Sequence, residues 1–301
     1  MTEHYGPLVK RATLASTFVA TLLIITKLLA WVMTGSASML ATLTDSLMDV
    51  SASLLNLFAV RYALQPADKE HRFGHGKAES LAGLGQAAFI AGSAMLLMFH
   101  SVDRIINPQP INKTEVGIAV IVLALVLTLA LLAYQGYVVR KTGSQAVKAD
   151  ALHYRSDLLL NGAVLLALVM GSQGWWWADG GLALIIAVYI LVSAGAIAFE
   201  SGQTLLDREL PDEEQAQIMA VVRRHPRVHG AHDLRTRQAG PTKFIQLHLE
   251  LPDELSLREA HRIADEVEQS LMAVFPGADV LIHQDPLSVL PVEERKVPEN
   301  G

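Results

Sequence analysis

The chain has 301 residues, of which 51% are hydrophobic and 18% charged, and its formal net charge at pH 7 is −6. Ordinary soluble domains carry about 25% charged residues, so this composition favours a membrane protein. The negative charge argues against a nucleic-acid partner. The sequence contains no cysteine, which excludes disulfides and thiolate metal sites. Any metal would have to be held by His, Asp and Glu.

Six apolar segments are long enough to cross a bilayer, since a spanning helix needs about 20 mostly apolar residues. They cover approximately residues 9–33, 38–63, 80–106, 115–139, 146–171 and 176–200. The N-terminal residues have no small-residue cleavage site, so we expect the first segment to remain as an anchor. Lys and Arg gather before the first segment and in the loops after the second and fourth. This pattern predicts that both termini are cytoplasmic.

The composition changes after Glu200, where charges become frequent and no long apolar run remains. Residues 212–225 and 256–275 are predicted helices, and the second opens with a Ser-x-x-Glu capping box. Period-two alternation in HDLRTRQ, KFIQLHLEL and ADVLIHQD predicts three strands. We therefore predict an all-α six-helix transmembrane domain followed by a small cytoplasmic α+β domain of order αββαβ. The expected boundaries are 1–208 for the first domain, 209–290 for the second and 291–301 for a disordered tail.

Two pairs of ionisable residues interrupt the apolar segments. Asp45 and Asp49 lie in the second segment, and His153 and Asp157 lie in the fifth. Each pair is spaced four residues apart, so its members share one helix face. A carboxylate at the bilayer centre costs about 2.5–3.5 kcal/mol on insertion scales, which makes an intramembrane role more plausible than simple hydrogen bonding for two matched pairs. Together they would give Zn²⁺ the tetrahedral set that it prefers.

These pairs, on the second and fifth of six predicted helices, resemble the metal-ligand motifs of the cation diffusion facilitator family. The loop PADKEHRFGHGKAE and the C-terminal stretches HDLRTRQAGPTKFIQLHLEL and IHQDP resemble its bacterial zinc and iron efflux branch. The resemblance covers all but the extreme C-terminus. It implies a homodimer in the bacterial inner membrane, surrounded by lipid, with a metallochaperone-like cytoplasmic domain. It also implies a secondary active transporter that exports a divalent metal ion in exchange for protons by alternating access.

The resemblance makes the two intramembrane pairs the transport site. His153 and Asp49 are then the expected proton-exchange residues, because ligands must lose their protons before they bind metal. The histidine argues for Zn²⁺ or Cd²⁺ as substrate and against Mn²⁺, and leaves Fe²⁺ open. The expected ligands are Asp45, Asp49, His153 and Asp157.

Further sites are implied outside the membrane. The loop site consists of Asp68, His71 and His75. The cytoplasmic site is binuclear, and in it Asp285 bridges two Zn²⁺ ions that stabilise the dimer and regulate transport. Its ligands are His232, His248, His261, His283 and Asp285. Lys77 and Asp207 match a structural salt bridge of the family. Taken singly, each of these histidines is more simply interpreted as an ordinary surface residue. The loop could likewise be a solvated, charged loop without a metal ion.

Other functions fit the sequence less well. A membrane metal sensor or receptor without transport explains the cytoplasmic ligands but not the charged pairs inside the membrane. A metalloenzyme is disfavoured because neither H-E-x-x-H nor a phosphate-binding loop is present. An exporter of organic solutes would be expected to offer an aromatic-lined cavity, whereas the chain is 6% aromatic.

Overall fold

The computed structural model describes residues 2–34, 37–107, 115–172, 175 and 178–289. Two compact units divide the chain, one covering Glu3–Leu205 and the other the C-terminal part from Leu206 onward. The tail 291–301, which the sequence predicts to be disordered, lies outside the described residues.

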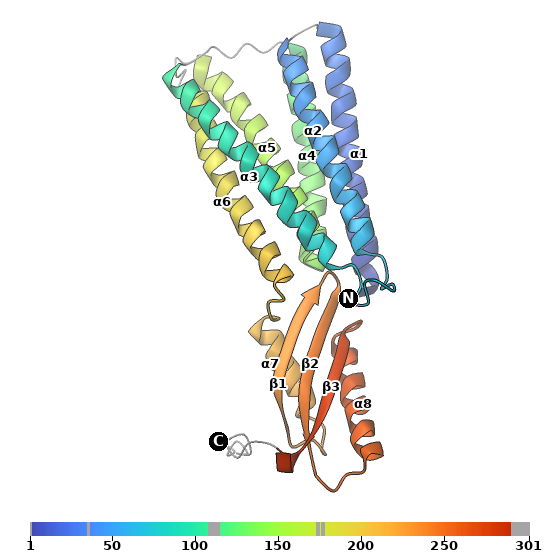
Figure 1. Ribbon diagram of the computed structural model, residues 1–301. Helices are drawn as coiled ribbons and strands as arrows, with labels where there is room; N and C mark the ends of the chain where they lie inside the picture. Colours follow the sequence, from blue (N-terminus) through green and yellow to red (C-terminus); the bar gives the residue numbers. More distant parts are fainter. Residues whose placement is uncertain (1, 35–36, 108–114, 173–174, 176–177, 290–301) are drawn as a thin grey trace. The chain divides into compact units, whose positions relative to one another are not determined.

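The first unit is a bundle of long helices (Figure 1). They are α1 (Thr2–Thr34), α2 (Ala37–Ala63), α3 (Lys77–Ile106), α4 (Glu115–Thr142), α5 (Gln145–Ser172) and α6 (Ala178–Leu205). Several of them continue beyond the apolar runs that predict them, most clearly α1 at its start and α6 at its end. Extending a formed helix adds one hydrogen bond for each residue that is fixed, so a helix does not stop where its apolar stretch stops.

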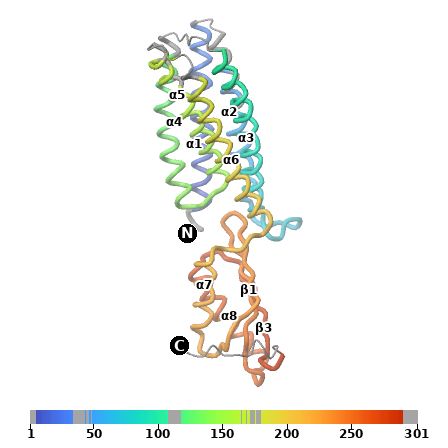
Figure 2. The backbone as a smooth tube through the Cα atoms, turned by 90° about the vertical axis from the view of Figure 1, so that its left-hand side faces the viewer, coloured from blue at the N-terminus to red at the C-terminus, as the bar shows by residue number. Residues whose placement is uncertain are grey.

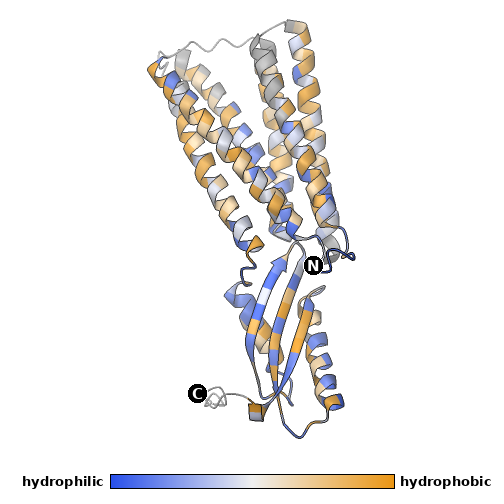
Figure 3. Cartoon of the chain, in the orientation of Figure 1, coloured by the Kyte–Doolittle hydropathy of each residue, from blue (hydrophilic) through white to orange (hydrophobic). Residues whose placement is uncertain are grey.

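The helices are coloured mainly hydrophobic in Figure 3. Within the described residues, four are long and apolar enough to cross a membrane: Tyr5–Met33, Lys77–Ile106, Ile118–Thr142 and Gly180–Leu205. The charged residues of α2 and α5 lower the hydropathy of those two helices. Large apolar side chains also point outward from the bundle, among them Phe18, Phe99 and Val192. Such a surface suits lipid rather than water.

Small residues let the helices approach closely. The α3–α6 contact is the most extensive between helices, and its buried core includes Ala87, Ala94 and Ala194. A Cβ added to Gly180 would stand 2.8 Å from the carbonyl oxygen of Ser101. Helix α5 packs against α3, α4 and α6, and it also contacts α2. Figures 1 and 2 show the bundle from two sides. This packing brings the polar face of α5 against its neighbours.

The second unit is a three-stranded sheet with two helices on one face (Figure 1). Its elements are α7 (Asp212–Val222), β1 (Gly230–Ala239), β2 (Thr242–Leu251), α8 (Leu257–Val274), β3 (Asp279–Pro286) and the short 3-10 helix η1 (Leu287–Val289). The predicted order αββαβ is confirmed. Strand β1 runs antiparallel to β2, and β3 runs parallel to β2. The capping box is present, since Ser256 Oγ accepts from the backbone N–H of Glu259.

Alternation along β2 separates a core face from an open face. Ile245, Leu247 and Leu249 are fully buried against α7 and α8 in one apolar core. His248 and Glu250 point to the opposite face, because successive side chains of a strand alternate. Gly240, at φ 57° in the two-residue turn between β1 and β2, supplies the positive φ that such hairpins require.

Candidate metal sites

The membrane candidate lies between α2 and α5. His153 Nε2 is 3.0 Å from Asp49 Oδ1 and 3.8 Å from Asp157 Oδ2. Ligands held at about 2.0–2.2 Å by one tetrahedral Zn²⁺ stand about 3.3–3.6 Å apart. The three groups are therefore spaced as ligands of a single small ion, and all their ligand atoms lie within 4.8 Å of one another.

The expected fourth ligand, Asp45, lies one turn before Asp49 on α2. Its backbone is helical, but its side chain lies outside the part of the chain that the structure describes. The helix supports the predicted sharing of one face by Asp45 and Asp49. The membership of Asp45 in the site stays a prediction.

The loop between α2 and α3 contains a second cluster of potential metal ligands. Asp68 Oδ1 is 3.4 Å from His71 Nδ1, and Asp68 Oδ2 is 3.2 Å from His75 Nε2. The His75 ring is buried and packs edge-on against Tyr62, with the ring centroids 4.6 Å apart. Gly74 has φ +80°, which bends the loop between the two histidines. The loop is therefore folded around its carboxylate.

Hydrogen bonds hold the Asp68 carboxylate in its ionised form. The backbone N–H of His71 donates to Asp68 Oδ1 at 2.6 Å, and that of Glu70 donates at 2.9 Å. These bonds, with that of His71 the stronger influence, lower the pKa of Asp68 below its ordinary value. A carboxylate that keeps its charge is a better cation ligand.

The cytoplasmic candidate is built by strand register. Residue pairing places His232 of β1 opposite His248 of β2, and His248 beside His283 of β3. Two residues along β2 and β3, Glu250 pairs with Asp285. All five residues consequently lie on the open face, as a row of three imidazoles next to a row of two carboxylates.

Asp285 lies at the centre of this cluster and is only 14% exposed. Its Oδ2 is 2.7 Å from His248 Nδ1 and 3.5 Å from His232 Nε2. Its Oδ1 is 3.2 Å from His283 Nε2. One oxygen thus faces two imidazoles and the other faces a third. This division suits a carboxylate that bridges two ions, and imidazole with carboxylate oxygen is a donor set that zinc accepts.

Two acidic residues extend the cluster beyond the residues expected from the sequence. Glu250 Oε1 is 3.0 Å from His232 Nδ1, and Asp233 Oδ2 is 3.7 Å from His248 Nε2. The alternation of β2 could have identified Glu250. Asp233 could not be found that way, because it lies at φ 49° beside an irregularity in the β1–β2 pairing.

The structure does not bring His261 into the cluster within one chain. It lies on α8, where it is exposed and 3.6 Å from Asp265, whereas the imidazole row lies on the sheet face that α8 leaves open. Its role as a ligand stays a prediction.

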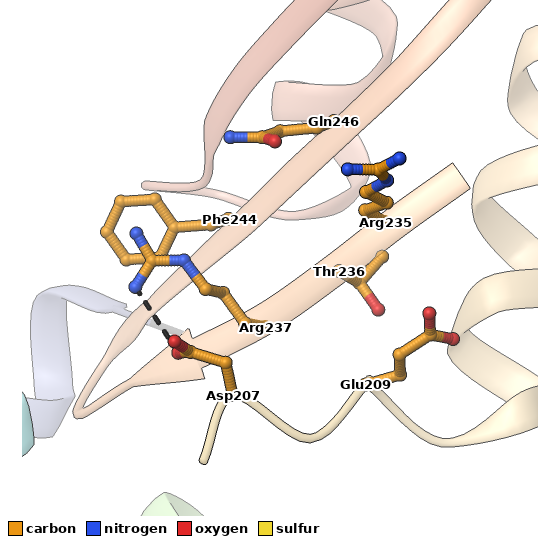
Figure 4. Close-up of a pocket in the computed structure, with 7 residues that line it drawn as sticks. All are labelled: Asp207, Glu209, Arg235, Thr236, Arg237, Phe244 and Gln246. Carbon is orange, nitrogen blue, oxygen red and sulfur yellow. Dashed lines mark hydrogen bonds and ion pairs between the residues drawn. The ribbon is translucent and has the colours of Figure 1, made fainter. Parts of the chain in front are cut away.

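The expected partners Lys77 and Asp207 belong to different units. Within its own unit, Lys77 Nζ donates to the carbonyl oxygen of Leu205 at 3.2 Å. Asp207 Oδ1 lies 3.5 Å from Arg237 Nη1, and the Arg237 guanidinium stacks on the Phe244 ring at 4.0 Å (Figure 4). These residues help to line a pocket of about 280 Å³, in which guanidinium groups make a metal site implausible. The Lys77–Asp207 salt bridge stays a prediction.

Comparisons with known proteins agree with this organisation. Residues 13–206 match the cation efflux transmembrane domain family, and residues 210–287 match the cytoplasmic domain of cation efflux proteins. The cation-efflux pump FieF of Salmonella paratyphi A is 56% identical over 98% of this chain and 99% of its own length. The FieF protein of Citrobacter koseri is 55% identical with the same coverage.

Solved domains of related transporters match about a quarter of the chain. The metal-bound C-terminal domain of the CzcD transporter from Thermotoga maritima is 28% identical, covering 27% of this chain and 100% of that one, with a TM-score of 0.25. CzrB in its zinc form is 38% identical, covering 28% of this chain and 98% of that one, with a TM-score of 0.27.

The family assignment rests on both domain matches and on relatives that align over nearly the whole chain. It confirms the predicted fold class, a helical transmembrane domain followed by a small cytoplasmic α+β domain. The chain is therefore a multi-pass membrane protein of the cation diffusion facilitator family, whose members are metal-cation efflux transporters.

Proposed function

We propose that this protein exports Zn²⁺ from the bacterial cytoplasm in exchange for protons, by alternating access to the site formed by α2 and α5. The observation that carries the proposal is the grouping of Asp49, His153 and Asp157 at ligand spacing inside the helical bundle. Intramembrane carboxylates and histidines are expensive to bury, and they mark ion and proton pathways.

Proton coupling follows from the chemistry of the proposed ligands. Zn²⁺ binds the ionised carboxylate and the neutral imidazole, so protons and metal compete for the same atoms. His153 is the group suited to trade protons near neutral pH, and Asp49, its closest carboxylate neighbour, is the second exchange residue that we propose. A site that opens to one side loaded with metal and to the other loaded with protons performs antiport.

The other clusters are assigned supporting roles. The loop cluster around Asp68 is a second cation site near the bundle. The cytoplasmic cluster around Asp285 holds Zn²⁺ as a structural or regulatory ion, which would stabilise a homodimer. We place the protein in the inner membrane with both termini in the cytoplasm, as the distribution of Lys and Arg supports. Cd²⁺ and Fe²⁺ are further candidate substrates.

The proposal is tested with purified protein in liposomes that contain a zinc indicator. An acidic lumen should drive Zn²⁺ inward as protons leave, and Asp49→Asn should reduce the initial rate by at least about 100-fold, because losing even an outer partner of a metal ligand costs about 10–100-fold. Asp103→Asn is the matched control, since Asp103 is an exposed carboxylate at the end of α3.

Two outcomes would contradict antiport: uptake that ignores the pH gradient, and uptake that survives Asp49→Asn. Zinc binding without any uptake would instead favour a metal receptor without transport. Repeating the assay with Cd²⁺ and Fe²⁺ ranks the substrates.

A further inference from the structure

A buried carboxylate outside the metal cluster has no role in the mechanism above. Asp150 lies on α5, three residues before His153, and is 1% exposed. A carboxylate that is kept from water inside a membrane bundle is costly and marks function more often than structure. The hydrogen-bonding groups around Asp150 decide whether the site accommodates only the carboxylate or also the protonated carboxyl.

Two side-chain amides donate hydrogen bonds to Asp150. Gln86 Nε2 of α3 donates to Asp150 Oδ1 at 3.3 Å, and Gln135 Nε2 of α4 donates to Asp150 Oδ2 at 2.7 Å. Ser16 of α1 is a further hydrogen-bonding neighbour. Among the described residues, no cation pairs with this carboxylate.

The nearest titratable groups lie on or beside α5. His153 faces the Asp49 carboxylate of α2. The Tyr154 hydroxyl lies 3.0 Å from Ser53 Oγ and donates to the Ser16 carbonyl oxygen. On the α6 side, Lys148 pairs with Glu200. The buried imidazole next to Asp150 therefore belongs to the metal cluster, and the nearby ammonium is already paired.

Gln135 provides a second, independent observation. Its side chain is fully buried, and its Oε1 has no hydrogen-bond partner among the described residues. Rotating the amide by half a turn would place Oε1, instead of Nε2, against Asp150. The amide donates to a carboxylate in one orientation and accepts from a protonated carboxyl in the other. This pair can consequently satisfy either protonation state of Asp150.

We propose that Asp150 and Gln135 form a proton-binding site that is separate from the metal ligands and coupled to them through α5. The inference rests on the proposed antiport function. With the metal site empty, the Asp150 carboxyl is protonated and donates a hydrogen bond to Gln135 Oε1. When a divalent ion binds at His153, its positive charge favours the carboxylate, and one proton leaves for solvent while Gln135 turns its N–H group to the oxygen.

The test measures how zinc affinity depends on pH in the full-length chain. Asp68→Ala and His248→Ala are present in every sample, so that the membrane site dominates binding. Linkage makes the slope of log affinity against pH equal to the number of protons released. Asp150→Asn should lower that slope by about one and should weaken binding progressively more as the pH rises. Asp103→Asn, the exposed control, should leave the slope unchanged.

The possible outcomes are distinct. A uniform loss of affinity at every pH, or an unchanged slope, would show that Asp150 is only structural and would overturn the inference. If the parent chain itself binds zinc at the membrane site without releasing protons, the proposed antiport function fails first.

A spectroscopic measurement covers the case in which Asp150→Asn does not fold. The infrared difference spectrum between zinc-free and zinc-bound protein should show the loss of a protonated-carboxyl C=O band. Gln135→Met keeps every carboxyl but removes the proposed acceptor, so it should shift that band. A spectrum identical to that of the parent chain would contradict the pairing of Asp150 with Gln135.

Discussion

The three candidate clusters differ in their ratio of carboxylate to imidazole. The membrane cluster has one histidine, His153, with Asp49 and Asp157, whereas the cytoplasmic cluster surrounds Asp285 with three imidazoles. Two ionised carboxylates already neutralise a divalent ion, and Asp45 would make the membrane site formally negative. Protons relieve that excess charge, so the carboxylate-rich site is the one suited to exchange. In the cytoplasmic cluster, three neutral imidazoles face Asp285 itself, which suits a resident ion.

Glu250 provides a test at the level of one side chain. Its Oε1 lies 3.0 Å from His232 Nδ1, where it orients the ring and leaves Nε2 toward Asp285. Loss of such an outer partner typically costs about 10–100-fold in metal affinity. We therefore expect Glu250→Gln to weaken zinc binding at the cytoplasmic site by about that factor.

Isothermal titration of the full-length chain carrying Asp49→Asn and Asp68→Ala would measure this change. Glu254→Gln, in the exposed turn after β2, is the matched control and should bind as the parent does. Equal affinity for Glu250→Gln and the control would show that the charge of Glu250 does not strengthen His232 as a ligand.

For the helices and strands, residue spacing within one element predicted which side chains share a face, but it did not predict which elements lie side by side. The spacing of Asp45–Asp49 and of His153–Asp157 identified one face on each helix, and the alternation of β2 placed His248 on the polar side. The pairing of His232, His248 and His283 depends on strand register and on an irregularity in β1. Register is a tertiary property, so alternation within one strand does not reveal it. The same holds for Asp150, whose proposed role depends on Gln135 of another helix, α4.

Helix α8 is joined to the turn after α7 by a hydrogen bond between side chains. His225 Nε2 lies 2.9 Å from Glu266 Oε2, and Arg262 contacts the other oxygen of Glu266 at 3.3 Å. The hydrogen bond from His225 lowers the pKa of Glu266 below its ordinary value. A lowered carboxyl pKa stabilises the folded protein at any pH above the ordinary pKa of the group. This stability is lost as the pH falls through the lowered pKa.

We expect Glu266→Gln to speed amide hydrogen exchange in α8 severalfold at neutral pH. The difference from the parent should shrink as the pH is lowered, because the native carboxyl then also becomes neutral. Glu268→Gln on the same helix is the control and should exchange as the parent does. A difference that persisted unchanged in acid would assign the effect to something other than the charge of Glu266.

On the scale of the whole molecule, the proposed zinc site around Asp285 would link metal binding to assembly. A ligand that binds only the native arrangement stabilises it by mass action, by about 2.7 kcal/mol at a hundredfold excess over Kd. If zinc on the open sheet face stabilises the proposed homodimer, removing it should loosen the contact between the cytoplasmic domains. The chain has no cysteine, so a single Gln269→Cys substitution on exposed α8 gives one spin label per protomer.

Pulsed electron paramagnetic resonance on the labelled dimer should give a narrow distance distribution with zinc and a broader one after chelation. His248→Ala should remain broad in both conditions, because it removes a ligand that lies 2.7 Å from Asp285. His229→Ala makes the same chemical change at an exposed histidine just before β1 and should behave as the parent does. Identical distributions with and without zinc would show that the cytoplasmic metal does not stabilise the dimer. The absence of any measurable distance between labels would contradict the homodimer itself.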